Sequence, residues 1–268
     1  MSAPGAGVRW ILLHGFAGAP ASWYETLAEV SPQLEPIAPR LCGHGLAGAG
    51  TVEGSRCRGG FAEEVERIAE LTSASARVAG ERRVIAGYSL GGRLALGLSI
   101  EHPELFDAVV LVSAHPGLEA EAERAARVAA DERWALLLER EGVASFAAAW
   151  ERQPVFAGQG CLPTPALEWQ LRTRLRHDPR ALAGAMRTLS LGAMPSYVSR
   201  VESVALPVWW VVGERDVKFR AVAGATASRM ARARVEVLAG CGHNLLLEAP
   251  VELARVMRAV GDEAAKAP

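Results

Sequence analysis

Five short, mostly apolar runs recur along the chain, and each is followed by a glycine-rich or polar corner. Runs this short and apolar suit strands that are buried on both faces, as in a parallel sheet. Apolar residues at helical spacing lie between them, for example in 61–71 and 253–260. This alternation predicts an α/β fold with a mostly parallel, doubly wound sheet and right-handed crossovers. The five runs are Val8–Leu13, Val84–Ala86, Ala108–Val112, Val208–Val212 and Val235–Leu238.

One long interval, residues 115–204, breaks the alternation. It contains no convincing strand, and several prolines interrupt its Ala-, Glu-, Arg- and Leu-rich sequence. A loop of that length without structure of its own is uncommon in a compact domain. We therefore predict a helical cap of four or five short helices at 115–204. The core domain is then formed by residues 1–114 and 205–268.

The charge balance restricts the partners of the protein. Lys and Arg number 29, Asp and Glu number 30, and the net charge is −1. Nucleic acids and anionic membranes bind through a basic excess, which this chain lacks. No apolar run reaches the roughly 18 residues of a membrane span, and the first residues contain no signal-peptide core. We expect a cytoplasmic protein that acts on a small molecule, with no nucleic acid or membrane partner; its oligomeric state stays open.

The cysteines give no sign of a metal or a disulfide framework. No two of them form a C-x-x-C pair, and none belongs to a Cys/His cluster. This pattern excludes a disulfide scaffold and disfavours a structural zinc site. We expect no metal and no cofactor. The four cysteines are Cys42, Cys57, Cys161 and Cys241.

The sequence Gly87-Tyr88-Ser89-Leu90-Gly91 is the sharpest chemical signal in the chain. A G-x-S-x-G between a strand and a helix places the serine on a tight turn, with its hydroxyl exposed at the carboxyl end of the sheet. Here an apolar run precedes the motif and a helical pattern follows it. We predict that Ser89 is a nucleophile or base. The alternative is an ordinary glycine-rich turn with an unreactive serine.

The partners of this serine follow from chain order, which is serine, acid, histidine in this arrangement. Of the six histidines, only His243 follows the last apolar run. Asp216 is the one aspartate between the serine and His243 that follows an apolar run, Val208–Val212, and Glu214 is the second choice for the acid. These side chains have simpler explanations: His243 as a structural loop histidine, and either acid as a surface partner of Arg215 or Lys218.

The sequence His14-Gly15-Phe16 follows the first predicted strand. In this architecture the second N–H of an oxyanion hole comes from a loop in that position, and the first comes from the residue after the serine. We predict that the backbone N–H groups of Phe16 and Leu90 form the oxyanion hole. The alternative is a plain glycine turn with Phe16 in the core.

Taken together, these motifs resemble the α/β-hydrolase superfamily over essentially the whole chain. An arginine directly after GYSLGG, His115-Pro116-Gly117-Leu118 and WERQPVF at 150–156 further resemble the 2-succinyl-6-hydroxy-2,4-cyclohexadiene-1-carboxylate synthases of menaquinone biosynthesis. The loop Arg40–Gly45 departs from the family's usual D-x-P-G-H-G. The motifs shared with the superfamily are HGFAG at 14–18, GYSLGGR at 87–93, GERDVKF at 213–219 and GCGHN at 240–244.

This resemblance implies a lyase that eliminates pyruvate from a cyclohexene precursor carrying several carboxylates. It implies Ser89, Asp216 and His243 as the triad. Guanidinium groups suit bidentate carboxylate binding, so several arginines at one cavity would favour a polyanionic substrate. The substrate-binding residues that the resemblance implies are Tyr88, Arg93, Arg127, Trp150 and Arg174.

Three of these positions have a simpler explanation. Arg127 could pair with Glu123 on an exposed helix face. Arg174, which has arginines on either side at 172 and 176, could belong to a solvated basic face. Trp150 could be a core residue.

Two further readings of the function stay open at this stage. The same triad could act as the nucleophile of an ordinary serine hydrolase of esters or C–C bonds. The fold could also carry a binding protein without catalytic activity, although the intact Ser, Asp and His argue against it. Sequence alone does not separate proton abstraction by Ser89 from its acylation, and it does not show whether the cap closes.

Overall fold

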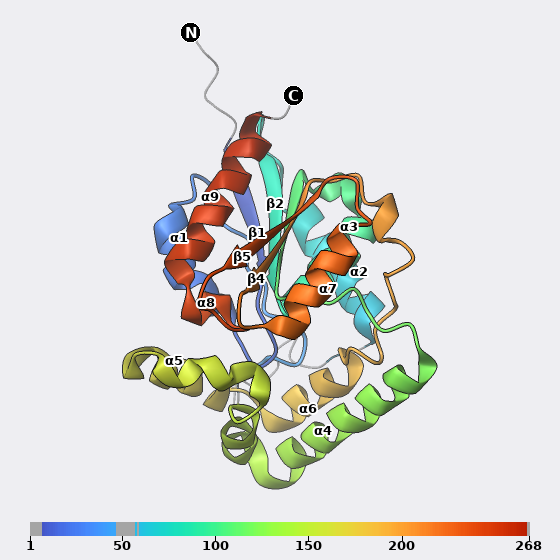
Figure 1. Ribbon diagram of the computed structural model, residues 1–268, viewed down its shortest axis with the longest axis vertical. Helices are drawn as coiled ribbons and strands as arrows, with labels where there is room; N and C mark the ends of the chain where they lie inside the picture. The colour runs from blue at the N-terminus through green and yellow to red at the C-terminus, as the bar shows by residue number, and fades with distance from the viewer. Residues whose placement is uncertain (1–6, 47–56, 58, 267–268) are drawn as a thin grey trace.

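The computed structural model describes residues 7–46, 57 and 59–266. Its centre is a parallel five-stranded sheet in the order β1-β2-β3-β4-β5 (Figure 1). Each strand contains one of the five predicted apolar runs, and β2, β4 and β5 extend beyond the predicted bounds. The strands are β1 (Val8–Leu13), β2 (Arg82–Tyr88), β3 (Ala108–Val112), β4 (Val208–Gly213) and β5 (Ala233–Leu238).

The chain winds in both directions from β1. After β1 the chain returns so that Ile37 lies along the free edge of that strand. The Leu12 N–H donates to the Ile37 carbonyl at 2.8 Å, and the Ile37 N–H donates to the Trp10 carbonyl at 2.8 Å. It then crosses to β2 on the other side of β1. Such a reversal of direction defines a doubly wound sheet, as predicted.

Helices cover both faces of the sheet. On one face α1 (Tyr24–Val30) packs against α9 (Pro250–Lys266), while α2 (Phe61–Ala74), α3 (Leu90–Glu101) and α7 (Val217–Ala227) lie on the other (Figure 1). Alternate side chains of β1, β2, β3 and β4 enter two separate cores, whereas most side chains of the edge strand β5 are exposed. In β1, Trp10 belongs to one core and Ile11 to the other.

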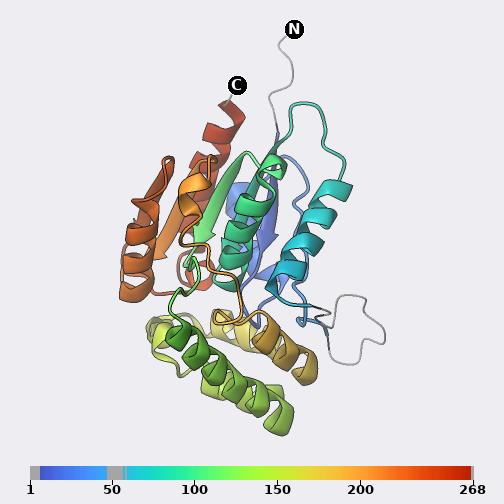
Figure 2. The ribbon, with the colours of Figure 1, turned by 90° about the vertical axis from the view of Figure 1, so that its right-hand side faces the viewer.

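A layer of helices lies beyond the carboxyl ends of the strands (Figures 1 and 2). It consists of α4 (Glu121–Trp150), η3 (Pro154–Cys161), α5 (Thr164–Leu175) and α6 (Pro179–Thr188). Gly142 divides α4 into two helical segments because its φ of 79° and ψ of 178° are not helical. The remaining elements are η1 (Pro20–Trp23), η2 (Pro103–Leu105), η4 (Val201–Ser203) and α8 (Leu245–Glu248).

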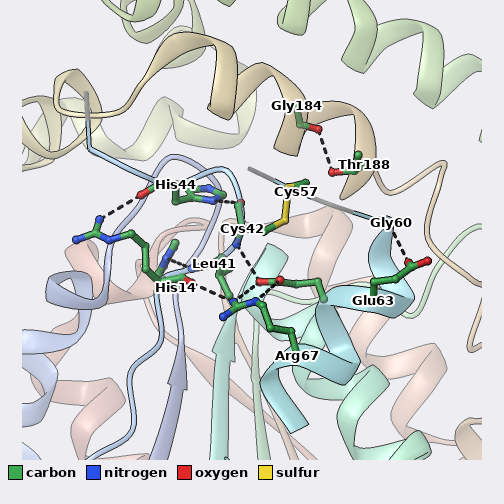
Figure 3. Close-up of a disulfide and its surroundings, with 12 residues drawn as sticks. His14, Leu41, Cys42, His44, Cys57, Gly60, Glu63, Arg67, Gly184 and Thr188 are labelled. Atoms are coloured by element: carbon green, nitrogen blue, oxygen red, sulfur yellow. Dashed lines mark hydrogen bonds and ion pairs between the residues drawn. A yellow bond between two sulfur atoms is a disulfide. The ribbon is translucent and has the colours of Figure 1, made fainter. Parts of the chain in front are cut away.

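Cys42 and Cys57 form a disulfide (Figure 3), which the sequence analysis did not predict. Their Cα atoms lie 5.0 Å apart although 15 positions separate them in the sequence. This proximity depends on how the loop after Ile37 meets the segment before α2, and a linear spacing does not reveal that path. Cys161 and Cys241 are free.

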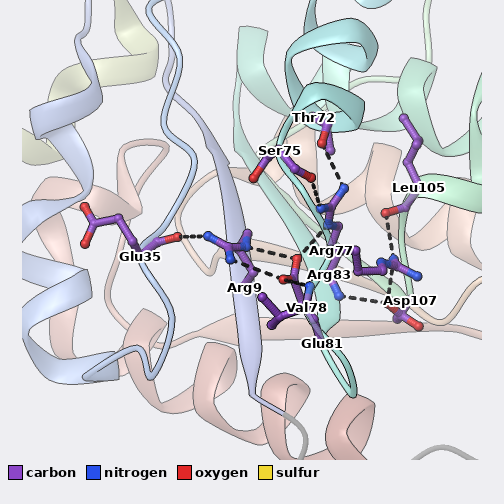
Figure 4. Close-up of polar contacts among 10 residues, drawn as sticks. All are labelled: Arg9, Glu35, Thr72, Ser75, Arg77, Val78, Glu81, Arg83, Leu105 and Asp107. Carbon is purple, nitrogen blue, oxygen red and sulfur yellow. Dashed lines mark hydrogen bonds and ion pairs between the residues drawn. The ribbon is translucent and has the colours of Figure 1, made fainter.

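Charged side chains connect the amino ends of the first two strands (Figure 4). Arg9 of β1 donates to Glu81 at 2.9 Å, and Arg83 of β2 donates to the same carboxylate at 2.7 Å. Burial of Glu81 acts to raise its pKa, but the bonds from the two arginines outweigh this effect and lower the pKa to about 2. No helix in the described part of the chain has the length and apolar character that a membrane span requires.

Candidate active site

Ser89 occupies a strained turn between β2 and α3. Its φ is 52° and its ψ is −105°, a conformation that residues other than glycine rarely adopt. The glycines around it are sterically required. A Cβ at Gly87 would lie 2.2 Å from the Gly91 carbonyl oxygen, and one at Gly91 would lie 2.1 Å from the Leu13 carbonyl oxygen. This tight packing holds the Ser89 hydroxyl at the carboxyl end of the sheet.

Ser89, His243 and Asp216 form one hydrogen-bonded chain. The Ser89 hydroxyl lies 3.2 Å from Nε2 of His243, and Nδ1 of His243 lies 2.6 Å from Oδ2 of Asp216. The histidine and the aspartate are both buried. Because Nδ1 faces a carboxylate it carries the proton, which leaves Nε2 free to accept from Ser89. Glu214, the second choice for the acid, instead accepts from the Gly240 N–H at 2.8 Å.

Two residues that the sequence analysis missed support His243. The buried Ser113 hydroxyl, just beyond β3, donates to the His243 carbonyl at 2.8 Å. The Glu248 carboxylate accepts from the backbone N–H groups of Gly242 and Asn244, on either side of the histidine, at 2.5 and 3.0 Å. The position of Ser113 after an apolar run is a signal that could have found it. Glu248 gives no such signal.

The two residues predicted to supply oxyanion donors belong to the serine turn and to a loop that contacts it. Leu90 directly follows Ser89, and the loop with Phe16 packs against the turn, since a Cβ at Gly15 would lie 2.7 Å from the Tyr88 ring. Neither the Phe16 nor the Leu90 N–H donates to another residue that the structure describes. Both groups are therefore available to an acceptor that enters with a ligand.

Two cavities flank this site. The first, of about 50 Å³, is lined by Phe16, Tyr88, Phe156 and Arg174, among others. The second is an open hollow of about 630 Å³, with Asp216, Lys218, Phe219 and His243 in its wall. The ring of Phe156 lies 6.3 Å from that of His243, next to the boundary between the two cavities.

Arg93 lies one helical turn beyond Ser89 and lines neither cavity in the described part of the structure. Its guanidinium donates to the Leu189 carbonyl at 2.9 Å and lies over the Phe61 ring at 5.9 Å. No carboxylate among the described residues pairs with it. Burial, with a smaller contribution from the charge of Arg127, lowers the pKa of Arg93 to about 9.

The other two predicted arginines each have an acidic partner. Nε of Arg127 donates to both oxygens of Asp131 at 2.9 Å, one helical turn further on, so Asp131 takes the place that the sequence analysis considered for Glu123. Arg174 is buried, pairs with Glu151 and faces the first cavity, unlike the exposed Arg172. It therefore does not belong to a solvated basic face.

Trp150 lies within a group of aromatic rings. It stacks on Phe146 with centroids 5.1 Å apart and lies 5.5 Å from the Phe16 ring. Trp150 therefore packs beside the loop 14–18, called the oxyanion loop below because it carries Phe16. It does not line either of the two described cavities. The described residues contain no group of three His, Cys, Asp or Glu side chains that could hold a metal ion.

The geometry of the serine turn, the histidine and the surrounding sheet is that of an α/β hydrolase. The alpha/beta hydrolase family model matches residues 10–256, and the chain belongs to this family. Within it the chain belongs to the 2-succinyl-6-hydroxy-2,4-cyclohexadiene-1-carboxylate synthases, as shown by similarity along nearly its whole length to proteins of that name.

Two such relatives illustrate the similarity. The synthase of Salmonella schwarzengrund is 32% identical over 252 residues, which cover 92% of this chain and 93% of the relative. That of Citrobacter koseri is 31% identical over 257 residues, covering 94% and 95%. The solved structure of MenH from S. aureus has a TM-score of 0.87 at 24% identity, with 98% of this chain and 96% of that chain covered. This match confirms the predicted α/β-hydrolase fold.

Proposed function

We propose that the protein is a lyase that eliminates pyruvate from a succinyl-hydroxycyclohexene dicarboxylate precursor. The product is 2-succinyl-6-hydroxy-2,4-cyclohexadiene-1-carboxylate, the compound in the names of its relatives. One observation carries the proposal: the Ser89–His243–Asp216 chain is complete in a sequence that is similar to these synthases over nearly its full length. We also propose that residues 115–204 act as a cap over this site.

In the proposed mechanism Ser89 acts as a base. Asp216 keeps the proton of His243 on Nδ1, so Nε2 accepts the Ser89 proton while Ser89 removes a proton from the substrate ring. The electrons of the broken C–H bond form a ring double bond, and the bond between the ring and the enolpyruvyl oxygen breaks. Pyruvate leaves as its enolate, which takes the proton from Nε2 of His243, so that Ser89 and His243 return to their starting protonation states. The N–H groups of Phe16 and Leu90 stabilise the oxyanion that develops on the substrate.

The substrate carboxylates would be held by guanidinium groups. Arg93 is the best supported of these because its charge has no acidic partner among the described residues, and a substrate carboxylate would supply one. Arg174 and Tyr88 face the first cavity together and would contact another part of the substrate. The resemblance also implies Arg127 and Trp150, but Arg127 is paired with Asp131 and Trp150 packs against Phe146, and neither residue lines a described cavity.

A serine hydrolase of esters or C–C bonds is the second candidate. The same hydrogen-bonded chain with two open N–H groups beside the serine suits acyl transfer as well as proton abstraction. A binding protein without activity is disfavoured, because such a protein has no need of a strained serine turn or of an aligned His–Asp pair.

The deciding experiment measures pyruvate release from the family substrate, with p-nitrophenyl acetate as a parallel ester substrate. We expect pyruvate release by the wild type. Ser89→Ala and His243→Ala should each lower kcat by at least about a hundredfold, and the double variant should be little worse because the two residues act as one unit. Ester turnover without pyruvate release would favour the hydrolase, and neither activity would favour the binding protein.

A further inference from the structure

Two buried histidines connect the oxyanion loop to the neighbouring loop at 40–46. Nδ1 of His14 donates to the Gly15 carbonyl at 2.8 Å, and Nε2 of His14 accepts from the Leu41 N–H at 3.2 Å. Nδ1 of His44 donates to the Cys42 carbonyl at 2.9 Å (Figure 3), and its Nε2 accepts from the Ala17 N–H at 3.0 Å. Each ring thus contributes one donor and one acceptor.

The bond from Ala17 falls at a strained position. Ala17 has a φ of 54°, which is unfavourable for alanine, and it directly follows Phe16. Strain of this kind persists only where the surroundings hold the backbone. His44 supplies the acceptor for the Ala17 N–H, and the Gly18 N–H closes the turn onto the Gly15 carbonyl at 3.1 Å.

The surroundings of His44 keep its ring neutral. Nε2 faces an N–H, so a proton there would have no acceptor and would break the bond from Ala17. Burial lowers the pKa of His44 well below its ordinary value, and His14, His177 and Arg40 add to this effect. The His177 ring of the helical layer packs edge-on to His44 at 5.5 Å, and neither of its nitrogens has a hydrogen-bond partner among the described residues.

We propose that His44 is a positioning residue for catalysis: by accepting from the Ala17 N–H it fixes the strained turn that aims the Phe16 N–H at the oxyanion. This inference rests on the oxyanion role proposed above for Phe16. It applies equally to elimination and to ester hydrolysis, because an oxyanion develops in both. His44 therefore acts on the rate through the loop and does not touch the substrate.

The test compares three variants with similar side-chain size. His44→Phe retains a ring and removes the acceptor, whereas His44→Gln can return an acceptor oxygen near the position of Nε2. His177→Phe is the matched control, because it changes a buried ring of the same cluster that accepts no hydrogen bond. We expect His44→Phe to lower kcat about ten- to a hundredfold with KM within about twofold. His44→Gln should recover roughly tenfold of this loss, and His177→Phe should stay near the wild type.

Binding of phenylboronic acid provides a readout that a purely structural role would not change. Its adduct with an active-site serine places a charged oxygen in the oxyanion hole, so His44→Phe should weaken its binding by about the factor lost in kcat. Unchanged kcat and boronate affinity in folded His44→Phe would overturn the proposal. Equal losses in His177→Phe, or no recovery in His44→Gln, would also overturn it.

A measurement on the wild type covers the case in which His44→Phe does not fold. Nitrogen-15 NMR of the histidine side chains should show His44 as the neutral Nδ1–H tautomer from pH 5 to 9, and the opposite tautomer would contradict the proposal. Failure of the proposed function has a different signature. If the wild type turns over the ester but releases no pyruvate, the proposed lyase function is wrong. The role of His44 is then still tested by the ester turnover rate and the boronate affinity of the same variants.

Discussion

Arg93 differs from the other two predicted arginines in what its guanidinium contacts. Arg127 and Arg174 each have a carboxylate partner within the described residues, whereas Arg93 donates to the carbonyl of Leu189. A partly buried cation without an anion is unfavourable, and a carboxylate that enters with the substrate offsets this cost. Loss of the Arg93 charge should therefore slow turnover of a polyanionic substrate more than turnover of a neutral one.

We predict that Arg93→Ala lowers kcat/KM for pyruvate release about ten- to a hundredfold, the effect of one lost charge-assisted contact. Turnover of p-nitrophenyl acetate should stay within a few-fold, because this ester has no carboxylate. Arg93→Lys keeps the charge without the planar fork and should recover only part of the loss. Equal losses on both substrates, in a variant with wild-type thermal unfolding, would make Arg93 a structural residue.

Among individual residues, the sequence correctly predicted the side chains that follow directly after a strand in a fixed order along the chain. Ser89, Asp216 and His243 each follow a strand, and the structure brings them together. Contacts that depend on rotamers or on distant loops were not predictable. Arg127 has an acid one turn away in both directions along α4, and only packing selects Asp131 over Glu123.

Among the helices and strands, those buried in the core were predicted most accurately from the sequence. The run Ala108–Val112 coincides with β3 residue for residue, because a fully buried strand is apolar throughout. The edge segment at Ile37 makes only one bridge to β1, and its sequence lacks the apolar run of the central strands. The break at Gly142 was also missed, since an isolated glycine within a helical pattern is usually tolerated.

The loop that carries His243 should depend on the short helix α8. Glu248 accepts from two backbone N–H groups that flank the histidine, so Glu248→Ala leaves this loop without its anchor. We predict that kcat falls about ten- to a hundredfold, since small displacements of a catalytic group have effects of that size, while KM changes little. Glu252→Ala, one turn further on and exposed, is the control. A loss of the same size there would place the effect in overall helix stability.

The disulfide should stabilise the fold through the connection between the loop after Ile37 and α2. Its closed loop spans 15 positions, and a cross-link of that length contributes about 3 kcal/mol in the chain-entropy description. We predict that Cys57→Ser lowers Tm by roughly 6–12 °C and leaves kcat near the wild type at low temperature. A Tm that is insensitive to this change and to reductant would show that the bond contributes no stability. Cys161→Ser, at an exposed free cysteine, is the matched control.

Across the whole molecule, chemistry and stability occupy opposite ends of the sheet. The Ser89–His243–Asp216 chain lies at the carboxyl ends of the strands, on the side of the sheet where the helical layer lies. The charged network around Glu81 lies at their amino ends (Figure 4). Substitutions at the amino end should therefore change unfolding and leave turnover unaffected.

Glu81 is the position in this network where a substitution should change unfolding most clearly. Its side chain is fully buried and accepts from Arg9 and Arg83. Glu81→Gln leaves both guanidinium groups without their anion, which should cost about 3 kcal/mol and lower Tm at pH 7 by roughly 6–12 °C. Glu35→Gln removes an equal charge nearby and keeps the backbone carbonyl that accepts from Arg9, so it should have little effect.

The same pair of variants predicts the pH dependence of unfolding. The pKa of Glu81 is about 2 in the folded protein, below its ordinary 4.5, so its contribution to the free energy of unfolding is complete above pH 4.5. It is lost as the pH falls from 4.5 towards 2, because the unfolded chain then binds the proton more tightly. The Tm difference between the wild type and Glu81→Gln should therefore shrink across this window. The Tm difference between the wild type and Glu35→Gln should stay small throughout. A difference that stays constant from pH 6 to pH 3 would show that the Glu81 charge is not what holds β1 and β2 together.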